Sequence, residues 1–400
     1  MKINVAGKRA LVRVDFNVPL NKKHEITDDT RMRKALPTIN KLLDEGASVV
    51  LMSHLGRPQK KLMEDGSIDV KKFTLRHIAP HLSNLLDRPV KFADSCIGEE
   101  VVMKARALQS GEVLLVENTR FHKGEAKGDS EFAAELSKLG EVYINDAFGT
   151  AHRAHASTTV VADSFDASSK DFGLLMAAEV ENANKVLHHP DRPLVAITGG
   201  AKVSDKLLLL EKLIDFADTV IIGGGMAYTF FKAQGGSIGD SICEDDKLDL
   251  AIRLMEMAKQ KNTTLLLPTD NIAADKFSND ANRQTVDSMS IPDGWEGLDI
   301  GPKSVELFSS AIKGAKTIIW NGPMGVFEFD NFAAGTNAIA QAVADATAAG
   351  AFSLIGGGDS VAAITKNGLD DQVSHVSTGG GAMLEYLEGK KLPGIQAITG

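Results

Sequence analysis

The 400-residue sequence predicts an α/β protein of two domains, each built on a parallel sheet with helices on both faces. Short β-branched runs alternate with longer helical patterns almost throughout, as in parallel sheets covered by helices. At least ten strands are expected, more than one sheet comfortably holds. Apolar runs that end in paired or triple glycine occur only after residue 190, so the two halves are expected to bind ligands differently.

The strands are expected where β-branched and other apolar residues are bounded by glycine, proline or polar residues. In the first half they are 10–14, 48–52, 113–116 and 142–145, and in the second half 194–198, 219–222, 264–268, 317–320, 352–355 and 373–377. The first 18 residues suggest a strand pair interrupted by Gly7 and Lys8. Longer helical patterns lie between the strands, among them 30–46 and 246–261.

A hinge helix is predicted over about 171–189, because apolar residues recur there at helical spacing, at Met176, Val180, Ala183 and Leu187. A polar turn at 168–171 precedes it, and two prolines between 188 and 193 end it. The predicted domains are therefore 1–170 and 171–388, with residues 389–400 expected to return to the first domain. The alternative is that this helix is one more surface helix of a single domain.

The composition excludes several classes of partner. A net charge of −9 and a pI of about 5.6 give no general positive field for nucleic acid or an anionic membrane. Any anion must therefore be held by a local cluster of basic side chains. No apolar stretch reaches about 18 residues, and Cys96 and Cys243 lie far apart without metal-ligand spacing. A cytoplasmic protein without disulfides is expected.

The glycines of the second half are expected to form anion sites, because bare N–H groups at a helix N-terminus bind anions. After the first run, Lys202 and Lys206 are four residues apart, which places both on one face of the predicted helix. Two ammonium groups beside free amides suit a chain of phosphates. The alternative is two solvated surface lysines.

A second glycine run, Gly356 to Ser360, places Asp359 at or next to the start of a helix. Helix capping is the simpler role for this carboxylate. Magnesium binding is the other, because Mg²⁺ takes one or two carboxylates and completes its shell with phosphate and water. Further amides are expected from Gly223, Gly224, Gly379, Gly380 and Gly381.

A loop dense in turn residues and aromatics follows another predicted strand, at 320–328. Phe327 and this loop are expected to line an apolar slot for a base, and Glu328 to accept from ribose hydroxyls. None of the triple glycine runs completes G-x-G-x-x-G. This absence weakens the rival interpretation as a nicotinamide dehydrogenase.

In the first half, charged and polar side chains follow the strands instead of glycines. Asp15 and Asn17 alternate after a strand and are expected to face one way, as partners for a hydroxyl and a neighbouring oxygen. Arg31 begins a helix, where the dipole disfavours a cation, so a role beyond helix formation is expected.

Four basic side chains follow the carboxyl ends of predicted strands, where ligands bind in open parallel sheets: His54, Arg57, Arg120 and Arg153. They are expected to form a basic bowl that grips a terminal phosphate bidentately. For any one arginine a surface ion pair is the alternative, but four at one topological position favour the bowl. His152 and His155 have no third metal ligand at useful spacing and are interpreted as structural histidines.

Motifs in a fixed order along the chain carry a family resemblance. They are RVDFNVP, SHLGRP, ENTRF, NDAFGTAHRAHAS, GGAKVSDK, GGGMAYTF, WNGPMGVFE, GGGDS and STGGGA. With these motifs the sequence resembles the bacterial phosphoglycerate kinases over its whole length. The resemblance implies two Rossmann-like domains joined by a hinge. It also implies that the first domain binds 3-phosphoglycerate or 1,3-bisphosphoglycerate and the second binds Mg-ADP or Mg-ATP.

The resemblance further implies residue roles. Asp15 and Asn17 match ligands of the substrate's hydroxyl end, and Arg31 matches the arginine beside its carboxyl and the transferred phosphoryl. The basic bowl matches the site of the non-transferred phosphate. The transferred phosphoryl is expected to meet Lys202, Gly379 and Gly380. The nucleotide is expected to meet Lys202, Lys206, Gly223, Gly224, Asn321, Glu328, Gly357, Gly358, Asp359 and Ser360, with Asp359 as the magnesium ligand.

The implied activity is reversible, magnesium-dependent phosphoryl transfer between 1,3-bisphosphoglycerate and ADP, giving 3-phosphoglycerate and ATP, as in glycolysis and gluconeogenesis. Because the acceptor is an ionised carboxylate, no general base is needed. Domain closure is expected before transfer, and family habit favours a monomer. Ser360 replaces the threonine of many relatives, and the charged stretch 59–72 has no assigned role. A non-catalytic nucleotide-binding protein is the remaining alternative.

Overall fold

The computed structural model describes all residues from 1 to 400 and divides into two compact units. The first unit comprises Met1–Glu181 together with Lys391–Gly400, and the second comprises Asn182–Lys390. The division falls inside helix α7 (Leu174–His188), within the segment expected to be a hinge helix. None of the helices is both long enough and apolar enough to cross a membrane.

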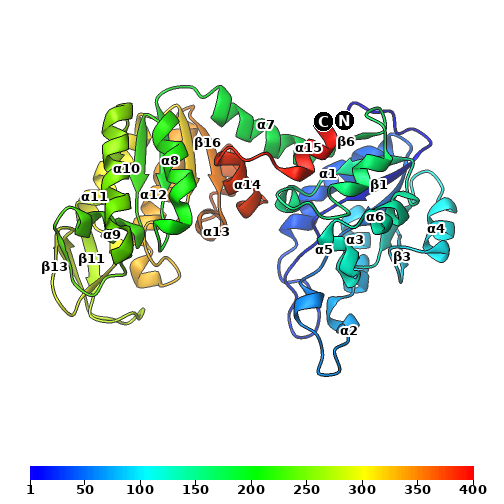
Figure 1. The fold of residues 1–400 in the computed structure, drawn as a ribbon, viewed down its shortest axis with the longest axis horizontal. Helices are drawn as coiled ribbons and strands as arrows, with labels where there is room; N and C mark the ends of the chain where they lie inside the picture. Colours follow the sequence, from blue (N-terminus) through cyan, green and yellow to red (C-terminus); the bar gives the residue numbers. More distant parts are fainter. The chain divides into compact units, whose positions relative to one another are not determined.

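A six-stranded parallel sheet organises the first unit (Figure 1). Its strands, in spatial order, are β3 (Val90–Ala93), β4 (Val113–Val116), β2 (Ser48–Met52), β1 (Arg9–Arg13), β5 (Val142–Asn145) and β6 (Lys170–Phe172).

Helices cover both faces of this sheet. Successive residues of β1 enter different cores, since Ala10 and Val12 join one apolar cluster and Leu11 joins the other. The first cluster contains residues of α1 (Thr30–Asp44) and α3 (Ala79–Leu86), and the second contains residues of α4 (Glu99–Arg106) and α6 (Ser130–Ser137). The predicted layer architecture is confirmed here.

A second six-stranded parallel sheet organises the second unit. Its strands, in spatial order, are β10 (Thr264–Leu266), β8 (Thr219–Ile222), β7 (Leu194–Thr198), β15 (Thr317–Asn321), β16 (Phe352–Gly356) and β17 (His375–Val376). The helices are α8 (Leu207–Phe216), α9 (Met226–Ala233), α10 (Leu248–Lys261), α11 (Pro302–Lys313), α12 (Ala334–Ala348), α13 (Gly358–Lys366) and α14 (Gly380–Leu387).

Both faces of this sheet are buried. Val195 and Ile197 of β7 enter a core shared with α11, α12 and α13. Ala196, which points to the opposite face, is also fully buried.

A small antiparallel sheet in the second unit was not predicted from the sequence. Strand β11 (Asp270–Ala274) pairs with β12 (Arg283–Asp287) and β14 (Glu296–Ile300). Most residues of β12 are polar and exposed, so the strand lacks the apolar alternation by which a half-buried strand is recognised. Strands β9 (Ser237–Ile238) and β13 (Ser290–Ile291) form a further short pair.

Two local predictions were wrong. The first 18 residues contain one strand, β1, instead of a strand pair. The segment expected to be a polar turn at 168–171 contributes the edge strand β6, which pairs with β5. A three-residue edge strand of half-buried, partly charged residues carries no periodic signal.

The last residues of the chain pack into the first unit through α15 (Pro393–Thr399). The Gly394 amide donates to Ala151 O at 2.8 Å, and Asn145 Nδ2 donates to Gly394 O at 3.3 Å. Ala397 and Ile398 pack against one of the two cores of this unit.

The stretch 59–72 projects from the body of the first unit and leads into α2 (Val70–Phe73) (Figure 1). It folds back on itself through an antiparallel bridge between Leu62 and Ile68. A short helix, α5 (Lys123–Lys127), lies between β4 and β5 in the sequence.

Candidate active site

The sheet order of the first unit brings the predicted site residues to one edge. Strands β4, β2, β1 and β5 are neighbours, and all run parallel. The side chains that follow their carboxyl ends therefore meet at the same edge, where open parallel sheets bind ligands. These side chains are Arg120 after β4, His54 and Arg57 after β2, Asp15 and Asn17 after β1, and Arg153 after β5.

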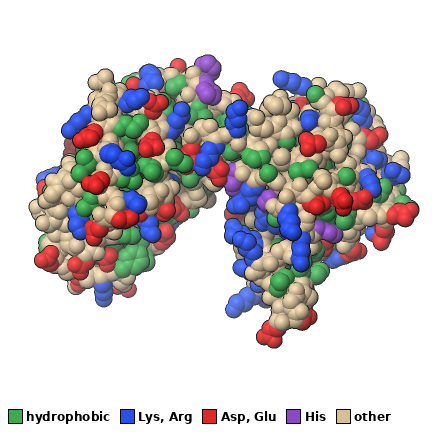
Figure 2. Space-filling model, in the orientation of Figure 1, with side chains coloured by type: hydrophobic (Ala, Val, Ile, Leu, Met, Phe, Trp, Pro, Cys, Tyr) green, Lys and Arg blue, Asp and Glu red, His purple; other side chains and the backbone are tan.

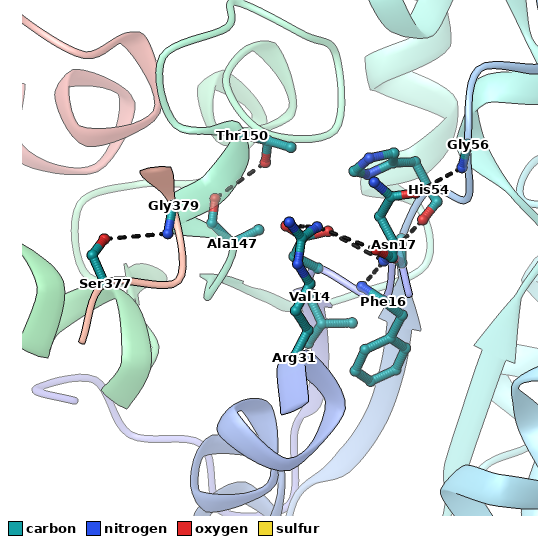
Figure 3. A network of polar contacts seen from close by, with 12 residues as sticks. Val14, Phe16, Asn17, Arg31, His54, Gly56, Ala147, Thr150, Ser377 and Gly379 are labelled. Carbon is teal, nitrogen blue, oxygen red and sulfur yellow. Dashed lines mark hydrogen bonds and ion pairs between the residues drawn. The ribbon is translucent and has the colours of Figure 1, made fainter. Parts of the chain in front are cut away.

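Arg31 is in direct contact with Asn17 (Figure 3) and with Asp15. Arg31 Nη1 donates to Asp15 Oδ2 at 3.1 Å and to the Asn17 carbonyl at 3.2 Å. Asn17 Oδ1 accepts from the Gly56 amide at 2.8 Å. Strand β1 ends at Arg13, so a turn rather than strand alternation orients the pair, and the Asn17 amide donates to Asp15 Oδ1 at 3.2 Å.

Three of the four residues of the expected basic bowl line a cavity of about 630 Å³: Arg57, Arg120 and Arg153. Arg57 and Arg153 are exposed, whereas Arg120 is partly buried and donates from Nη1 to Gly56 O at 2.7 Å. Burial, together with Arg13 and Arg153, lowers the pKa of Arg120 to about 10, so its guanidinium stays charged at neutral pH. Figure 2 shows Lys and Arg side chains gathered along one edge of the first unit.

Sequence reasoning missed the other basic residues of this cavity, which are Lys60, His122, Lys123 and Lys127. The three lysines and His122 come from the 59–72 stretch and from α5 with the residue before it. Neither segment follows a predicted strand directly, so their convergence depends on the tertiary fold.

His54 is buried, with 3% of its surface exposed, and is not among the residues that line the cavity. Arg13 Nη2 lies 3.0 Å from His54 Nδ1. A guanidinium can only donate, so Nδ1 is the acceptor and the ring proton is on Nε2. Burial lowers the pKa of His54 well below its usual value, and Arg13, Arg120 and Arg31 lower it further. His54 is therefore a neutral hydrogen-bond donor.

A buried network of opposite charges lies in the same unit. Arg13 and Glu125 have no exposed surface. Ser157 connects them, because its Oγ accepts from Arg13 Nε at 2.8 Å and donates to Glu125 Oε1 at 2.6 Å. The Ser157 amide also donates to Glu125 Oε2 at 3.0 Å. This network fixes α5 to the loop that carries Arg153.

The interpretation of His155 as a satisfied structural histidine was wrong. Its ring lines the 630 Å³ cavity, only 9% of its surface is exposed, and Nδ1 has no hydrogen-bond partner. Burial, then Arg120, Arg13 and Arg153, lowers the pKa of His155 to about 4. His155 is thus a neutral imidazole with one buried nitrogen that lacks a hydrogen-bond partner.

In the second unit, strands β8, β7, β15, β16 and β17 are consecutive and parallel. The glycine runs that follow them therefore meet at the carboxyl edge of that sheet. A Cβ on Gly224 would lie 2.7 Å from Gly200 N, and one on Gly380 would lie 3.2 Å from Gly358 N. The backbones approach so closely that a side chain is excluded at Gly224 and would be tighter than an ordinary contact at Gly380.

The expected placement of Lys202 and Lys206 on one helix face was wrong. Helix α8 begins at Leu207, Lys206 ends a 3₁₀ turn, and Lys202 precedes both. Lys206 Nζ donates to Asn321 Oδ1. Burial lowers the pKa of Lys206, while Asp359 and Glu388 act in the opposite direction. The loop, not helical periodicity, brings Lys206 to Asn321, and Lys202 is exposed.

Asn321 carries an unused donor. The residue is 1% exposed, and its Nδ2 has no hydrogen-bond partner. An added Cβ on Gly357 would lie 3.2 Å from the same nitrogen, so the amide group faces the Gly357 loop. A buried amide without a partner at this edge suits a ligand acceptor.

The structure decides against a capping role for Asp359. Gly357 is the N-cap of α13, no side chain makes a capping hydrogen bond, and Asp359 is an exposed residue of the first turn. No group of three or more His, Cys, Asp or Glu side chains is gathered to hold a metal. A single free carboxylate beside bare amides fits Mg²⁺ that is shared with nucleotide phosphates.

Three further predicted residues have definite environments. The Ser360 hydroxyl is buried and accepts from the Gly322 amide at 2.5 Å, so it fixes the neighbouring loop. The Gly379 amide donates to Ser377 Oγ at 3.2 Å (Figure 3). Glu328 is exposed.

The expected role of Phe327 in a base slot was wrong. The ring is 7% exposed and belongs to the main core of the second unit. An aromatic residue in a turn-rich loop has the same sequence pattern whether it packs inward or lines a site.

Comparison with known proteins agrees over the whole chain. The family described as phosphoglycerate kinase matches residues 1–390. A phosphoglycerate kinase of Porphyromonas gingivalis is 51% identical over 422 aligned positions, covering 100% of this chain and 99% of the relative.

Two solved structures are similar in fold. Phosphoglycerate kinase from Coxiella burnetii superposes with a TM-score of 0.87 at 42% identity, covering 100% of this chain and 97% of that one. Phosphoglycerate kinase from Pyrococcus horikoshii OT3 gives a TM-score of 0.81 at 32% identity, covering 99% and 97%. With full-length identity of this order and the same fold, the chain belongs to the phosphoglycerate kinase family.

Proposed function

We propose that the chain performs its phosphoglycerate kinase function with the phosphoglycerate on the first unit and the magnesium nucleotide on the second. The observation that supports this division is the difference between the two sheet edges. Arginine side chains line the cavity at the first edge, and closely packed glycine loops occupy the second. The reaction is reversible phosphoryl transfer between 1,3-bisphosphoglycerate and ADP.

On the first unit, the cavity lined by Arg57, Arg120 and Arg153 holds the non-transferred phosphate. Guanidinium forks match phosphate oxygens bidentately. His155 adds a neutral contact, and His54 donates from Nε2. Arg31, oriented by Asp15 and the Asn17 carbonyl, lies beside the carboxyl group that gains or loses the phosphoryl.

On the second unit, the amides of the 223–224 and 357–358 loops and the Lys206 ammonium hold nucleotide phosphates. Asn321 donates its free Nδ2–H, and Glu328 accepts from the ribose. Asp359 is the residue that would hold magnesium, which when bound neutralises charge on the phosphates.

The phosphoglycerate carboxylate is ionised at neutral pH, so the transfer needs no general base. Transfer needs in-line alignment and neutralisation of charge on the equatorial oxygens. Arg31 and Lys202 supply positive charge. The first amides of α14, from Gly380 onward, lack intrahelical partners and supply donors beside Gly379. We also propose that the protein acts as a monomer, because one chain supplies all these groups.

A coupled assay with Mg-ATP and 3-phosphoglycerate tests the function. Turnover that depends on both substrates and on Mg²⁺ is the expected result. Binding of both ligands without turnover would instead indicate a non-catalytic nucleotide-binding protein. Removal of Mg²⁺ with a chelator should abolish turnover while 3-phosphoglycerate still binds, since its residues lie on the first unit.

A further inference from the structure

A second cavity in the first unit, of about 570 Å³, has no role in the proposed reaction. It is formed by residues from 17–24, 55–56 and 69–73, and thus by one end of the stretch 59–72 that sequence reasoning left unassigned. None of the arginines of the basic bowl lines it. Its volume is within the usual range of small-molecule sites, about 300–1,000 Å³.

The cavity has apolar walls. Val18, Leu55 and Phe73 are among its lining residues and are 4%, 4% and 6% exposed. Val18 and Leu55 also belong to one of the two cores of the unit, so these side chains are held in place. Such a surface binds the flat or apolar body of a ligand.

The remaining charged side chains of the cavity are mostly cationic. Lys22, Lys71 and Lys72 line it, are exposed, and form no ion pair. Lys72 Nζ lies 5.6 Å from the centre of the Phe73 ring. The one carboxylate among the lining residues, Asp69, accepts from the Lys72 amide at 3.0 Å and caps α2. Three unpaired ammonium groups beside a single engaged carboxylate favour an anion carrying more than one charge.

The walls are ordered by their own contacts. The rings of His24 and His77 stack with centroids 4.4 Å apart, and His77 Nε2 lies 2.7 Å from Lys71 O. Asn21 Oδ1 accepts from the Lys23 amide at 2.8 Å and from the Glu25 amide at 3.0 Å. The His24–His77 stack joins the segment after β1 to the segment before α3, and the other contacts order each segment by itself, so the cavity is formed before a ligand arrives.

We infer that this cavity binds an organic phosphate with a flat apolar ring, the ring against Val18, Leu55 and Phe73 and the phosphate among Lys22, Lys71 and Lys72. A dianionic head matches the three cations, whereas inorganic phosphate leaves the apolar wall unused. Asn17 also lines the cavity, and its carbonyl accepts from Arg31. The site therefore shares Asn17 with the expected substrate residues, whereas none of the arginines of the basic bowl lines it.

Calorimetry with phenyl phosphate as the probe tests the inference. Saturating 3-phosphoglycerate and Mg-ADP are present throughout, so that both substrate sites are occupied. Phenyl phosphate is expected to bind one site at least about tenfold more tightly than inorganic phosphate, because only its ring contacts the apolar wall. Equal affinities of the two probes would overturn the inference.

Charge variants locate the binding. K22A/K71A/K72A is expected to weaken phenyl phosphate binding at least about tenfold. The matched control K2A/K23A/K34A removes the same charge from exposed lysines that do not line the cavity, and it should bind as the wild type does. An equal loss of phenyl phosphate affinity in both variants would mean that only the net charge of the protein matters, and it would overturn the proposed site.

Chemical labelling gives an independent readout. The aldehyde of pyridoxal 5′-phosphate condenses with a lysine amine and releases water, and hydride from borohydride then reduces the imine to a stable secondary amine. Peptide mass spectrometry should show saturable labelling at Lys22, Lys71 or Lys72 that phenyl phosphate suppresses. The proposal would be contradicted if labelling of Lys22, Lys71 and Lys72 did not saturate but increased linearly with reagent concentration, as is expected for the exposed Lys34. Kinase turnover is assayed separately, so either result is independent of the proposed function.

Discussion

At the scale of single residues, the cavity lined by Arg57, Arg120 and Arg153 is supported by buried charges that do not line it. Arg13 and Glu125 are fully buried and are joined through Ser157. Removing one member of such a network leaves its partner's charge uncompensated, at a cost of about 3–5 kcal/mol. The network therefore matters for stability as well as for the position of Arg153.

Glu125→Ala is accordingly expected to lower the free energy of unfolding by about 3 kcal/mol. Urea denaturation followed by circular dichroism measures it. Glu131→Ala is the control, because Glu131 is an exposed residue of the neighbouring α6. Equal small losses in the two variants would show that the network contributes little.

Arg57→Ala should raise the KM for 3-phosphoglycerate and leave kcat nearly unchanged. In the proposed function Arg57 binds the phosphate that is not transferred, so its contribution is the same in the ground and transition states. Arg106→Ala, an exposed arginine on α4 that lines neither cavity, is the control. An unchanged KM in Arg57→Ala would refute the basic bowl.

Lys202→Ala is expected to lower kcat at least about tenfold, or roughly 1.4 kcal/mol of transition-state stabilisation. Lys202 is exposed in the structure, so loss of packing does not explain such an effect. Steady-state kinetics with both substrates saturating measures it. A kcat near that of the wild type would remove Lys202 from the mechanism.

Residue identities at the strand ends could be predicted, since Asp15, Asn17, Arg57, Arg120 and Arg153 all follow parallel strands. What the sequence could not show was the direction of each side chain. Phe327 packs into the core although the sequence predicted that it lines a base slot. His155 lines a cavity although the sequence predicted a structural histidine. Direction depends on packing partners that are distant in the sequence.

At the scale of elements, the N-terminal turn of α7 is hydrogen-bonded to a buried carboxylate, that of Asp146. Asp146 Oδ1 accepts from the Met176 amide at 3.1 Å, and Oδ2 has no hydrogen-bond partner. Burial raises the pKa of Asp146 to about 7, although hydrogen bonds from Thr38 and the α7 backbone act against the shift. The folded state therefore retains a proton at pH values where the unfolded state has lost it.

This shift gives a pH dependence with a definite sign. Between about pH 4 and pH 7 the folded state binds more protons at Asp146, so stability falls as pH rises, and the loss is complete above pH 7. The Asp146→Asn variant does not titrate at this position, so it does not lose this stability as pH rises. Its side-chain oxygen can still accept from the Met176 amide. The variant should be more stable than the wild type at pH 8, by at most about 4 kcal/mol, and much less so at pH 5.

Urea denaturation at the two pH values measures that difference. A gap of the same size at both values would mean that Asp146 does not titrate in this range. Asp166→Asn, an exposed residue of the same unit, should change stability equally at both.

Long strands and helices could be predicted well, and β2, β4, β5, β7 and β8 have the predicted bounds. Edge strands were predicted less well: β10 and β17 lie within predicted ranges, but β3, β6 and β12 were not predicted. Both β6 and β12 lack a continuous apolar face, and they are strands because a neighbour supplies hydrogen bonds. Such pairing is a tertiary effect that local sequence does not encode.

At the scale of the whole molecule, the proposed function puts the two ligands on separate units. The units must therefore bring the two ligands together before transfer. Small-angle scattering should therefore show a smaller radius of gyration when 3-phosphoglycerate and Mg-ADP are both bound than with either alone. An unchanged radius with both ligands bound would contradict closure. Two units were expected from the strand count and the glycine distribution, and the division at Glu181/Asn182 lies inside the predicted hinge helix rather than at the predicted boundary of 170/171.

The return of residues 391–400 to the first unit makes the second unit an insertion within the first. During synthesis, the inserted unit emerges complete while its host still lacks α15. The host must then hold Ala151 and Asn145 without the contacts that Gly394 supplies. Full consolidation of the first unit therefore requires residues 391–400, which follow the whole second unit in the sequence.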